Sequence, residues 1–292
     1  MHMNASSINY EVQTIDTKTE VERCCVSWTG GKDCNLALLQ AWRDPSLHVT
    51  CLVVFKPENK IDFDAHPLRL MQAQSESLGL PLRIMTLHSS ESYRHGYINA
   101  FKTLRDEHQI TVICTGDMDL VGNSTTNWME ECAEMVHGSP KIRISIPLWK
   151  ASRKECLQKL LNERFDVIFS CIKSPWFDES WCGKKIDLAT FHNMEAMSKT
   201  CDTGTLKIQH DWHSRDPRRN LLDLGGENGE YHTMVLDGPM YKYGIEIVHL
   251  SKPKANITEP AKKGEEQDRW WTYDGQTIWS LGLDFVVTKR PK

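Results

Sequence analysis

The stretch SWTGGKDC, Ser27 to Cys34, joins an apolar segment to a segment with helical periodicity. Arg23 to Trp28 is typical of a short buried strand, and Asp33 to Trp42 places leucine and alanine at helical spacing. The adjacent glycines permit positive φ and let backbone N–H groups approach an anion without an intervening Cβ atom. The N-terminus of the following helix favours negative charge, and Lys32 adds a cation. This stretch therefore predicts a phosphate-binding loop.

The loop differs from a Walker A motif, which needs a glycine five residues before the Gly of its Gly-Lys pair and Ser or Thr after the lysine. Val26 and Asp33 stand at these positions. A carboxylate next to polyphosphate is repelled unless Mg²⁺ lies between them. The alternative is a Gly-Gly turn with a solvated lysine and Asp33 as the N-cap of the helix. We favour the phosphate interpretation, because strand, glycines, lysine and helix follow one another in register.

Strand-like and helix-like segments alternate on the C-terminal side of this loop. The predicted strands are 47–55, 82–87 and 110–115, and the predicted helices are 67–78 and 93–107. Such alternation predicts a parallel sheet with helices on both faces, which binds ligands beyond the carboxyl ends of its strands. The loops of interest therefore follow Trp28, Phe55, Leu87 and Thr115.

A second region begins near Trp149. We expect a helix over 152–161, strands over 165–171, 232–236 and 245–250, an exposed linker over 251–269, and a closing hairpin over 270–289 around Asp274-Gly275. The predicted organisation is a disordered N-terminal segment (1–21), a domain that carries the phosphate-binding loop (22–150), a second domain that carries the GENGEYHT motif (151–250), and a linker with a C-terminal hairpin (251–292).

Composition excludes several classes of protein. The 292 residues are 40% hydrophobic and 25% charged, with a formal net charge of −4, which argues against non-specific nucleic-acid binding. No apolar run approaches the roughly 20 residues of a membrane span, and the first residues do not resemble a secretory signal. The ten cysteines show no C-x-x-C pair, so we expect most of them to be buried thiols in a cytoplasmic protein.

Several motifs resemble those of a known family. TGGKDC resembles the SGGKDS loop of the ATP pyrophosphatases, which cleave ATP between the α and β phosphates and transfer AMP to a substrate. Further similar segments are HPLRLMQAQSESLGLPL (66–82), CTGDMDL (114–120), IPLWKASRKE (146–155), WCGKKID (181–187) and GGENGEYHTMVLDGPMY (225–241). Together they resemble the diphthine–ammonia ligase family over about residues 22 to 250.

The resemblance implies a HUP-type α/β domain, a parallel sheet with helices on both faces, joined to a smaller α+β C-terminal domain. It also implies the last step of diphthamide formation on elongation factor 2, in which ATP adenylates the diphthine carboxylate and ammonia then displaces AMP. The expected cofactors are ATP and Mg²⁺. The expected partners are elongation factor 2 carrying diphthine and ammonium, with no membrane and no direct nucleic-acid contact.

The expected site residues fall into four groups. Those for ATP are Ser27, Thr29, Gly30, Gly31, Lys32, Asp33, Cys34, Phe55, Gly116 and Asp117. Those for catalysis are Lys32, Asp33, Glu227 and Glu230, and Asp33 is also the expected Mg²⁺ ligand. Those for the acid substrate are Asn228, Tyr231, His232, Thr233 and Asp187.

The GENGEYHT motif also has a direct chemical interpretation. Glu227 and Glu230 lie three residues apart on a glycine-rich turn, where paired carboxylates can hold Mg²⁺, bind a cation or deprotonate ammonium. Tyr231 offers an aromatic wall to a trimethylammonium group. The alternative is that both glutamates are solvated turn residues and that Thr233 begins a strand.

Other candidates carry weaker signals. Asp117 is equally suited to Mg²⁺ or ribose contact and to capping a helix, and Asp187 is equally suited to a pocket and to a helix cap. His66 faces the nucleotide or only precedes Pro67 in a turn, and we favour the turn slightly. The stretch HDWHSRDPRR (210–219) has metal-like histidine spacing but favours a solvated loop.

Departures from the family pattern keep other functions open. Cys34 replaces the serine that ends the usual loop, and Thr29 replaces its first serine, whereas a backbone cradle tolerates both. The alternatives are a paralogue that amidates another carboxylate, a tRNA-modifying enzyme of the same superfamily, and a nucleotide-binding module without turnover. A tRNA-modifying enzyme would be expected to show a basic surface or a catalytic cysteine pair, and neither is visible in the sequence.

Overall fold

The computed structural model describes residues 21–63, 65–88, 90, 92–120, 125–200, 222–248, 253–257, 276–281 and 286–291. The predicted disordered segment lies outside these residues except for Val21, and the HDWHSRDPRR stretch lies wholly outside them.

Five strands form the parallel sheet that the sequence predicts. They are β1 (Glu22–Ser27), β2 (Leu47–Pro57), β3 (Leu82–Leu87), β4 (Val112–Cys114) and β5 (Arg143–Ser145), in the order β3-β2-β1-β4-β5. β1 lies at the centre and pairs with β2 on one edge and β4 on the other. The chain order therefore reverses beside β1, which is where open sheets of this kind bind ligands.

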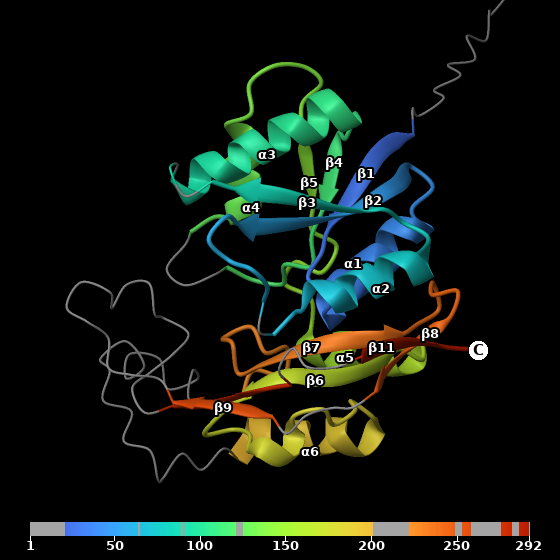
Figure 1. The fold of residues 1–292 in the computed structure, drawn as a ribbon, viewed down its shortest axis with the longest axis vertical. Coiled ribbons are helices and arrows are strands. Elements are labelled where there is room, and N and C mark those ends of the chain that lie inside the picture. Colours follow the sequence, from blue (N-terminus) through green and yellow to red (C-terminus); the bar gives the residue numbers. More distant parts are fainter. Residues whose placement is uncertain are drawn as a thin grey trace, which may run out of the picture.

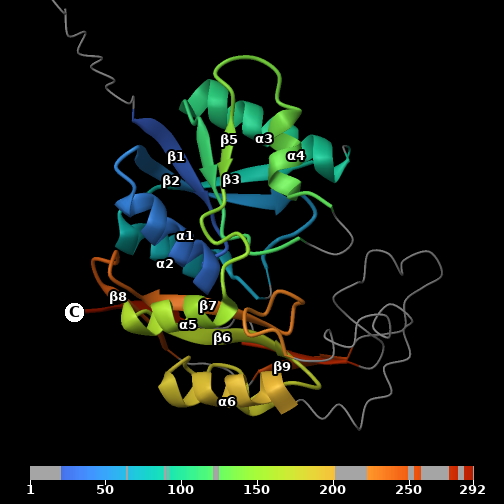
Figure 2. The same ribbon diagram turned by 180° about the vertical axis from the view of Figure 1, so that it is seen from behind.

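Helices cover both faces of this sheet (Figures 1 and 2). One face carries α1 (Lys32–Arg43) and α2 (Leu68–Leu78), and the other carries α3 (Tyr93–His108) and α4 (Trp128–Glu134). Successive strand residues point to opposite faces, so Cys24 and Val26 join the core under α1 and α2, whereas Cys25 joins the core under α3 and α4. Burial on both faces explains the apolar runs in β1, β2 and β4, whereas β3 and β5 at the edges are more exposed.

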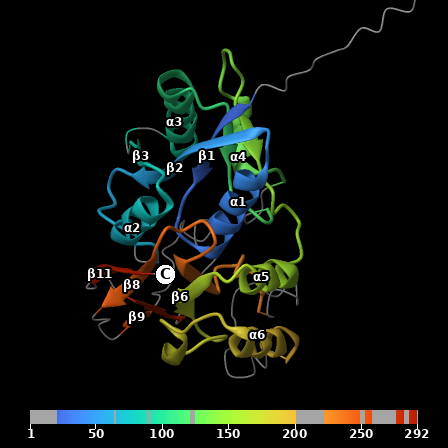
Figure 3. The same ribbon diagram turned by 90° about the vertical axis from the view of Figure 1, so that its right-hand side faces the viewer.

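A second layer lies against α1 and α2 on the side away from the parallel sheet (Figure 3). It contains a four-stranded antiparallel sheet in the order β7 (Tyr231–Asp237), β6 (Asp166–Lys173), β10 (Thr277–Ser280) and β9 (Lys254–Ile257). Separately, β8 (Gly244–Val248) pairs with β11 (Val286–Arg290). The helical elements here are α5 (Arg153–Asn162), the short 3₁₀ helix η1 (Glu179–Trp181) and α6 (Leu188–Thr200). This is the smaller α+β region that the sequence predicts.

The predictions for the C-terminal part are tested only in places. The turn of the predicted hairpin at Asp274-Gly275 lies outside the described residues. In the described part, β10 pairs with β6 on one edge and β9 on the other, and β11 pairs with β8. The predicted linker is not wholly irregular, because it contains β9, whose four residues are all exposed at the edge of the sheet. These pairings join distant parts of the chain, which local turn and charge signals do not indicate.

The two layers share one hydrophobic core, which runs from the α1 and α2 face of the parallel sheet into β6 and β7. Buried polar contacts also join them. The Gln74 side chain accepts from the Trp28 indole N–H and donates to the Val235 carbonyl, and the Tyr241 hydroxyl donates to Asn35 Oδ1 at 2.8 Å. The carboxyl end of β1 is thereby fixed against β7.

The cysteines are free thiols throughout the described part of the chain, and all of them except Cys182 are buried. This confirms the interpretation of the cysteines as small hydrophobic residues. Among the described residues, no helix combines the length and the apolarity needed to cross a membrane.

Candidate active site

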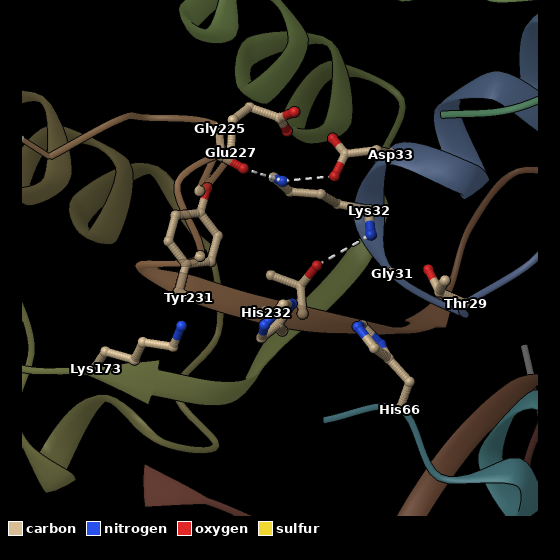
Figure 4. A pocket seen from close by; sticks show the side chains of 13 residues that line it. Thr29, Gly31, Lys32, Asp33, His66, Lys173, Gly225, Glu227, Tyr231 and His232 are labelled. Atoms are coloured by element: carbon tan, nitrogen blue, oxygen red, sulfur yellow. Dashed lines mark hydrogen bonds and ion pairs between the residues drawn. The ribbon is translucent and has the colours of Figure 1, made fainter. Parts of the chain in front are cut away.

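A cavity of about 440 Å³ lies beyond the carboxyl end of β1, where the phosphate loop faces the GENGEYHT segment (Figure 4). The loop, the segment before α2, the end of β6 and the start of β7 all contribute to its lining. The lining residues are Thr29, Gly31, Lys32, Asp33, His66, Lys173, Gly225, Gly226, Glu227, Gly229, Tyr231, His232 and Thr233.

The loop depends on its glycines. Gly30 has φ of +78°, and a Cβ atom there would lie 2.4 Å from Gln74 Oε1. Gly31 is the N-cap of α1 and no side chain of the loop caps the helix, so Asp33 does not serve as the N-cap. Asp33 instead lies in the first helical turn, where its charge complements the helix dipole.

β7 holds this loop from the other layer. The Lys32 N–H donates to Thr233 Oγ1 at 3.0 Å, and the Val235 N–H donates to the Gly30 carbonyl at 3.0 Å. Gly31 packs so closely that an added Cβ atom would lie 3.2 Å from the Thr233 carbonyl oxygen. The phosphate loop is therefore completed by a strand about 200 residues further along the chain.

Lys32 is buried and points into the cavity rather than into solvent. Its Nζ donates to Asp33 Oδ2 at 2.7 Å and to the Gly225 carbonyl at 2.5 Å, and it lies 5.1 Å from the centre of the Tyr231 ring. Burial alone lowers the pKa of this ammonium, but Asp33, Tyr231 and Glu227 outweigh it and raise the pKa above its ordinary value. Lys32 is thus a fixed cation between the loop and the GENGEYHT segment.

Asp33 and Glu227 face each other across Lys32 (Figure 4). Burial, followed by repulsion from Asp33, raises the pKa of Glu227 from 4.5 to about 8. Asp33 Oδ1 is buried without a hydrogen-bond partner. An unpartnered carboxylate oxygen facing the cavity could serve an ion such as Mg²⁺, which takes most of its ligands from phosphate and water. Among the described residues no three His, Cys, Asp or Glu side chains form a metal cluster.

Glu230 is fully buried, and its carboxylate faces away from the cavity. It accepts from the Asp223 N–H at 3.0 Å, the Asn228 N–H at 3.0 Å and Asn228 Nδ2 at 3.3 Å. Burial raises its pKa to about 7. The carboxylate of Glu230 organises the glycine-rich turn, and the Asn228 amide is turned toward it rather than toward the cavity.

The opposite side of the cavity is formed by nitrogen-bearing side chains, Lys173, His232 and His66 (Figure 4). Lys173 is only 4% exposed, and the rings of His66 and His232 meet edge to face with centroids 5.2 Å apart. Burial, followed by the charge of Lys32, lowers the pKa of His66 to about 4. Burial, followed by His66 and Lys173, lowers the pKa of His232 well below its ordinary value.

Comparison with known families identifies both halves of this cavity. The model of the diphthamide synthase N-terminal domain matches residues 22–136, and that of the diphthamide synthase C-terminal domain matches residues 215–273. The chain belongs to the diphthamide synthase family. The family is one of ATP-dependent amidating enzymes with a phosphate loop of the ATP pyrophosphatase type, so the HUP-type fold and the resemblance drawn from the motifs are confirmed.

Other comparisons add little to this diphthamide synthase assignment. The comparison with curated proteins found no match. Among solved structures, phosphoribosylglycinamide formyltransferase from Brucella melitensis is similar over 51% of this chain and 69% of its own, at 15% identity and a TM-score of 0.28. A likeness at that score carries no argument about fold or function.

In this member of the diphthamide synthase family, several expected site residues lie outside the cavity lining. Phe55 stacks on Tyr97, with ring centroids 4.7 Å apart, in the core under α3 and α4. Asp187 accepts from the Thr190 N–H in the first turn of α6, which lowers its pKa, so it caps that helix. Asp117 accepts from Thr115 Oγ1 and Asn127 Nδ2, and so ties the end of β4 to α4.

Four further expected residues support the loop without entering the cavity lining. Ser27 ends β1, and Gly30 is covered by Gln74. Cys34 is buried and its thiol donates to the Gly31 carbonyl at 3.2 Å. Gly116 lies directly against the first turn of α1.

Lys173 is the cavity residue that the sequence interpretation missed. It is a single lysine at the end of an apolar strand, and only burial of that strand end marks it as unusual. His66 was assigned to a turn, and its N–H does donate to the Phe63 carbonyl, but its ring also lines the cavity.

We predict that Gly116→Ala destabilises the protein by about 1–3 kcal/mol, because the added Cβ atom would lie 2.6 Å from the Asp33 carbonyl carbon. Gly96→Ala, inside α3, is the matched control. Its Cβ atom would come no closer than 3.3 Å to any atom, all of them in Leu87, and alanine favours the helix by up to about 1 kcal/mol. Urea denaturation of both variants measures the difference. Equal stabilities of the two variants would contradict the close packing of Gly116 on the loop.

Proposed function

We propose that this protein is an ATP-dependent, AMP-forming amide ligase that completes diphthamide on elongation factor 2. The observation that carries the proposal is that the phosphate loop and the GENGEYHT segment line one cavity, with Lys32 bonded to both of them. A nucleotide-activating loop and a carboxylate-bearing turn within one cavity suit the transfer of AMP to an acid followed by attack of an amine.

The proposed reaction has two steps. In the first, an oxygen of the diphthine carboxylate attacks the α-phosphorus of ATP, the bond to the β-phosphate oxygen breaks, and pyrophosphate leaves. In the second, ammonia attacks the acyl carbon, AMP leaves, and one proton is released with the amide. Both steps develop negative charge on phosphate oxygens, which preorganised donors and cations stabilise most effectively in an enclosed site.

The residues of the loop suit the first step. The first turn of α1 offers backbone N–H groups and the positive end of the helix dipole, and Lys32 contributes a fixed positive charge. Asp33 would hold Mg²⁺, which when bound neutralises charge on the phosphates. The unpartnered Oδ1 of Asp33 supports this role.

The carboxylate of Glu227 suits the second step. Ammonium must lose a proton before it can attack, and a carboxyl group with a raised pKa is a better base than an ordinary glutamate. Glu230 is not placed for this role, because its oxygens accept three hydrogen bonds within the turn. The Tyr231 ring already faces the Lys32 ammonium, so its use as a wall for a trimethylammonium group would require that contact to change.

Thr233 provides a test of how the two layers cooperate. Thr233→Val keeps the shape of the side chain but removes the acceptor of the Lys32 N–H, so we predict that KM for ATP rises about tenfold. Thr233→Ser keeps the hydroxyl and should stay close to the wild-type value. Thr288→Val, an exposed position on β11, is the matched control. A Thr233→Val enzyme with an unchanged KM for ATP would show that the hydroxyl does not position the loop.

The proposed function is tested by supplying purified protein with ATP, Mg²⁺, ammonium and elongation factor 2 carrying diphthine. We expect AMP to appear together with the mass change from acid to amide on the modified histidine. AMP formation with a different carboxylate but not with diphthine would identify a paralogue. Absence of ATP cleavage with every acid acceptor would indicate a nucleotide-binding module instead.

A further inference from the structure

Lys173, His232 and His66 come from three separate parts of the chain and meet on one side of the cavity (Figure 4). Lys173 ends β6, His232 is the second residue of β7, and His66 lies in the turn before α2. The register pairs His232 with Cys171, two residues before Lys173. Because alternate strand residues share a face, the side chains of Lys173 and His232 lie diagonally on the same face of the sheet.

This side of the cavity is electropositive. The cations here are Lys32 and Lys173. Beyond burial, Lys32 lowers the pKa of His66, and Lys173 and Lys32 lower that of His232. Burial lowers the pKa of Lys173, and Cys171 and Glu230 oppose this effect. Among the described residues, Glu230 is the one carboxylate that acts on it. Its oxygens already accept from the Asp223 and Asn228 N–H groups.

His66 gives an independent sign that a ligand belongs here. Its Nδ1 is buried and has no hydrogen-bond partner, although buried polar groups are nearly always paired. The ring lies beside the phosphate loop, because a Cβ atom on Gly31 would be 3.6 Å from His66 Cε1. A group that bonded this imidazole would therefore lie next to the loop.

We propose that Lys173, His232 and His66 form the subsite that holds the carboxylate of the acid substrate. This inference rests on the proposed function and names the part of the site that receives the acid. A lysine ammonium and imidazole N–H groups are suitable donors to carboxylate oxygens. The three residues lie outside the phosphate loop, so they can orient the acid while the loop and Lys32 hold the phosphates.

The alternative ligand for the same donors is a phosphate of ATP. The placement of the residues favours the carboxylate, because the glycines, the helix N-terminus and Lys32 already form a complete phosphate cradle on β1 and α1. The Asp33 carboxylate, on the other side of the cavity, would repel an acid. The carboxylate subsite thus lies where the protein supplies nitrogen donors.

The test compares the binding of two forms of elongation factor 2 in the absence of ATP and ammonium. One form carries diphthine, with its carboxylate, and the other carries diphthamide, with the neutral amide. We expect the full-length protein to bind the acid form at least about tenfold more tightly, since donors to a charged group favour it over an amide. Lys173→Met should remove most of this discrimination and leave KM for ATP unchanged.

Three results would overturn the proposal in distinguishable ways. If Lys173→Met keeps the acid–amide discrimination, the subsite is wrong while the proposed function stands. If the variant instead raises KM for ATP with unchanged binding of the acid, the donors serve a phosphate. If wild-type protein binds neither form of the factor, the proposed function itself fails and the subsite with it.

Two further variants guard against a merely structural explanation. Lys199→Met removes an ammonium from a side chain that is 70% exposed on α6, and it should bind both forms like the wild type. His66→Asn alters a residue in a turn rather than in a strand, and should reduce discrimination even if Lys173→Met does not fold. If Lys173 only balanced the charge of Glu230, Lys173→Met would change the thermal stability and leave the acid–amide discrimination intact.

Discussion

Lys32→Ala should lower ATP-dependent amide formation by about 100-fold or more, because it removes the fixed cation between the phosphate loop and the GENGEYHT segment. The fold should persist, since the Asp33 side chain is 26% exposed and water can replace the lost ammonium. Circular dichroism checks the fold, and ATP–pyrophosphate exchange with the acid substrate measures the adenylation step alone.

Two matched variants sharpen this prediction. Lys141→Ala removes an exposed lysine near the amino end of the parallel sheet and should leave exchange unchanged. Lys32→Arg keeps the charge, but the guanidinium is larger than the ammonium that it replaces. The buried position beside the Gly225 carbonyl leaves little room for it, so we expect only partial activity. Full turnover by Lys32→Ala would show that Lys32 has no role in adenylation.

Glu227→Gln should have the second largest effect and should change the pH profile. The raised pKa of about 8 means that the wild-type carboxylate becomes a base as pH rises through 8. The fraction of free ammonia also rises with pH in both enzymes, so the informative quantity is the ratio of wild-type to variant kcat/KM. We expect this ratio to increase up to about pH 8 and then level off at about 100.

The same pKa predicts an effect on stability. An acid whose pKa rises from 4.5 to about 8 on folding binds more protons in the native state, so its contribution to the free energy of unfolding declines as pH increases across that interval. Glu227→Gln should reduce this decline. The free energies of unfolding from urea denaturation at pH 5 and pH 8, for wild type and variant, measure this change.

Glu230→Gln is the control for the kinetic measurement. An amide cannot accept at both of its positions, so an N–H donor of Asp223 or Asn228 loses its partner and the protein is destabilised by about 1–3 kcal/mol. The pH dependence that Glu227 contributes should remain. If Glu227→Gln showed the same pH profile as the wild type, Glu227 would not be the base.

The parallel sheet and its loop could be predicted from sequence because their signals are local. β1 to β4 are predicted as extended segments that alternate with helical patterns, and the TGGKDC loop combines turn chemistry with a helix start. The three-residue β5 has no such pattern. Three strands of the second region are also predicted from local patterns, but their pairing is not. β6 lies between β7 and β10, about 60 and 110 residues further on, so its pairing depends on contacts that no short window contains.

The candidate site divides in the same way. The Lys32 and Glu227 side chains sit in motifs whose composition indicates their chemistry. Lys173 carries no such mark, and its importance arises only because the β6–β7 register brings it beside His232. For Glu230 the motif predicts a catalytic role, but in the structure its carboxylate accepts hydrogen bonds from the Asp223 and Asn228 N–H groups and stabilises the turn.

The bond from the Lys32 N–H to Thr233 has a consequence for synthesis on the ribosome. The helix that presents the phosphate loop emerges early, but its partner strand is made about 200 residues later. An emerging chain therefore has no complete phosphate loop until Val235 has left the exit tunnel, and contacts of such large sequence separation form slowly. The nascent chain therefore cannot consume ATP before its acid-binding half has been synthesised.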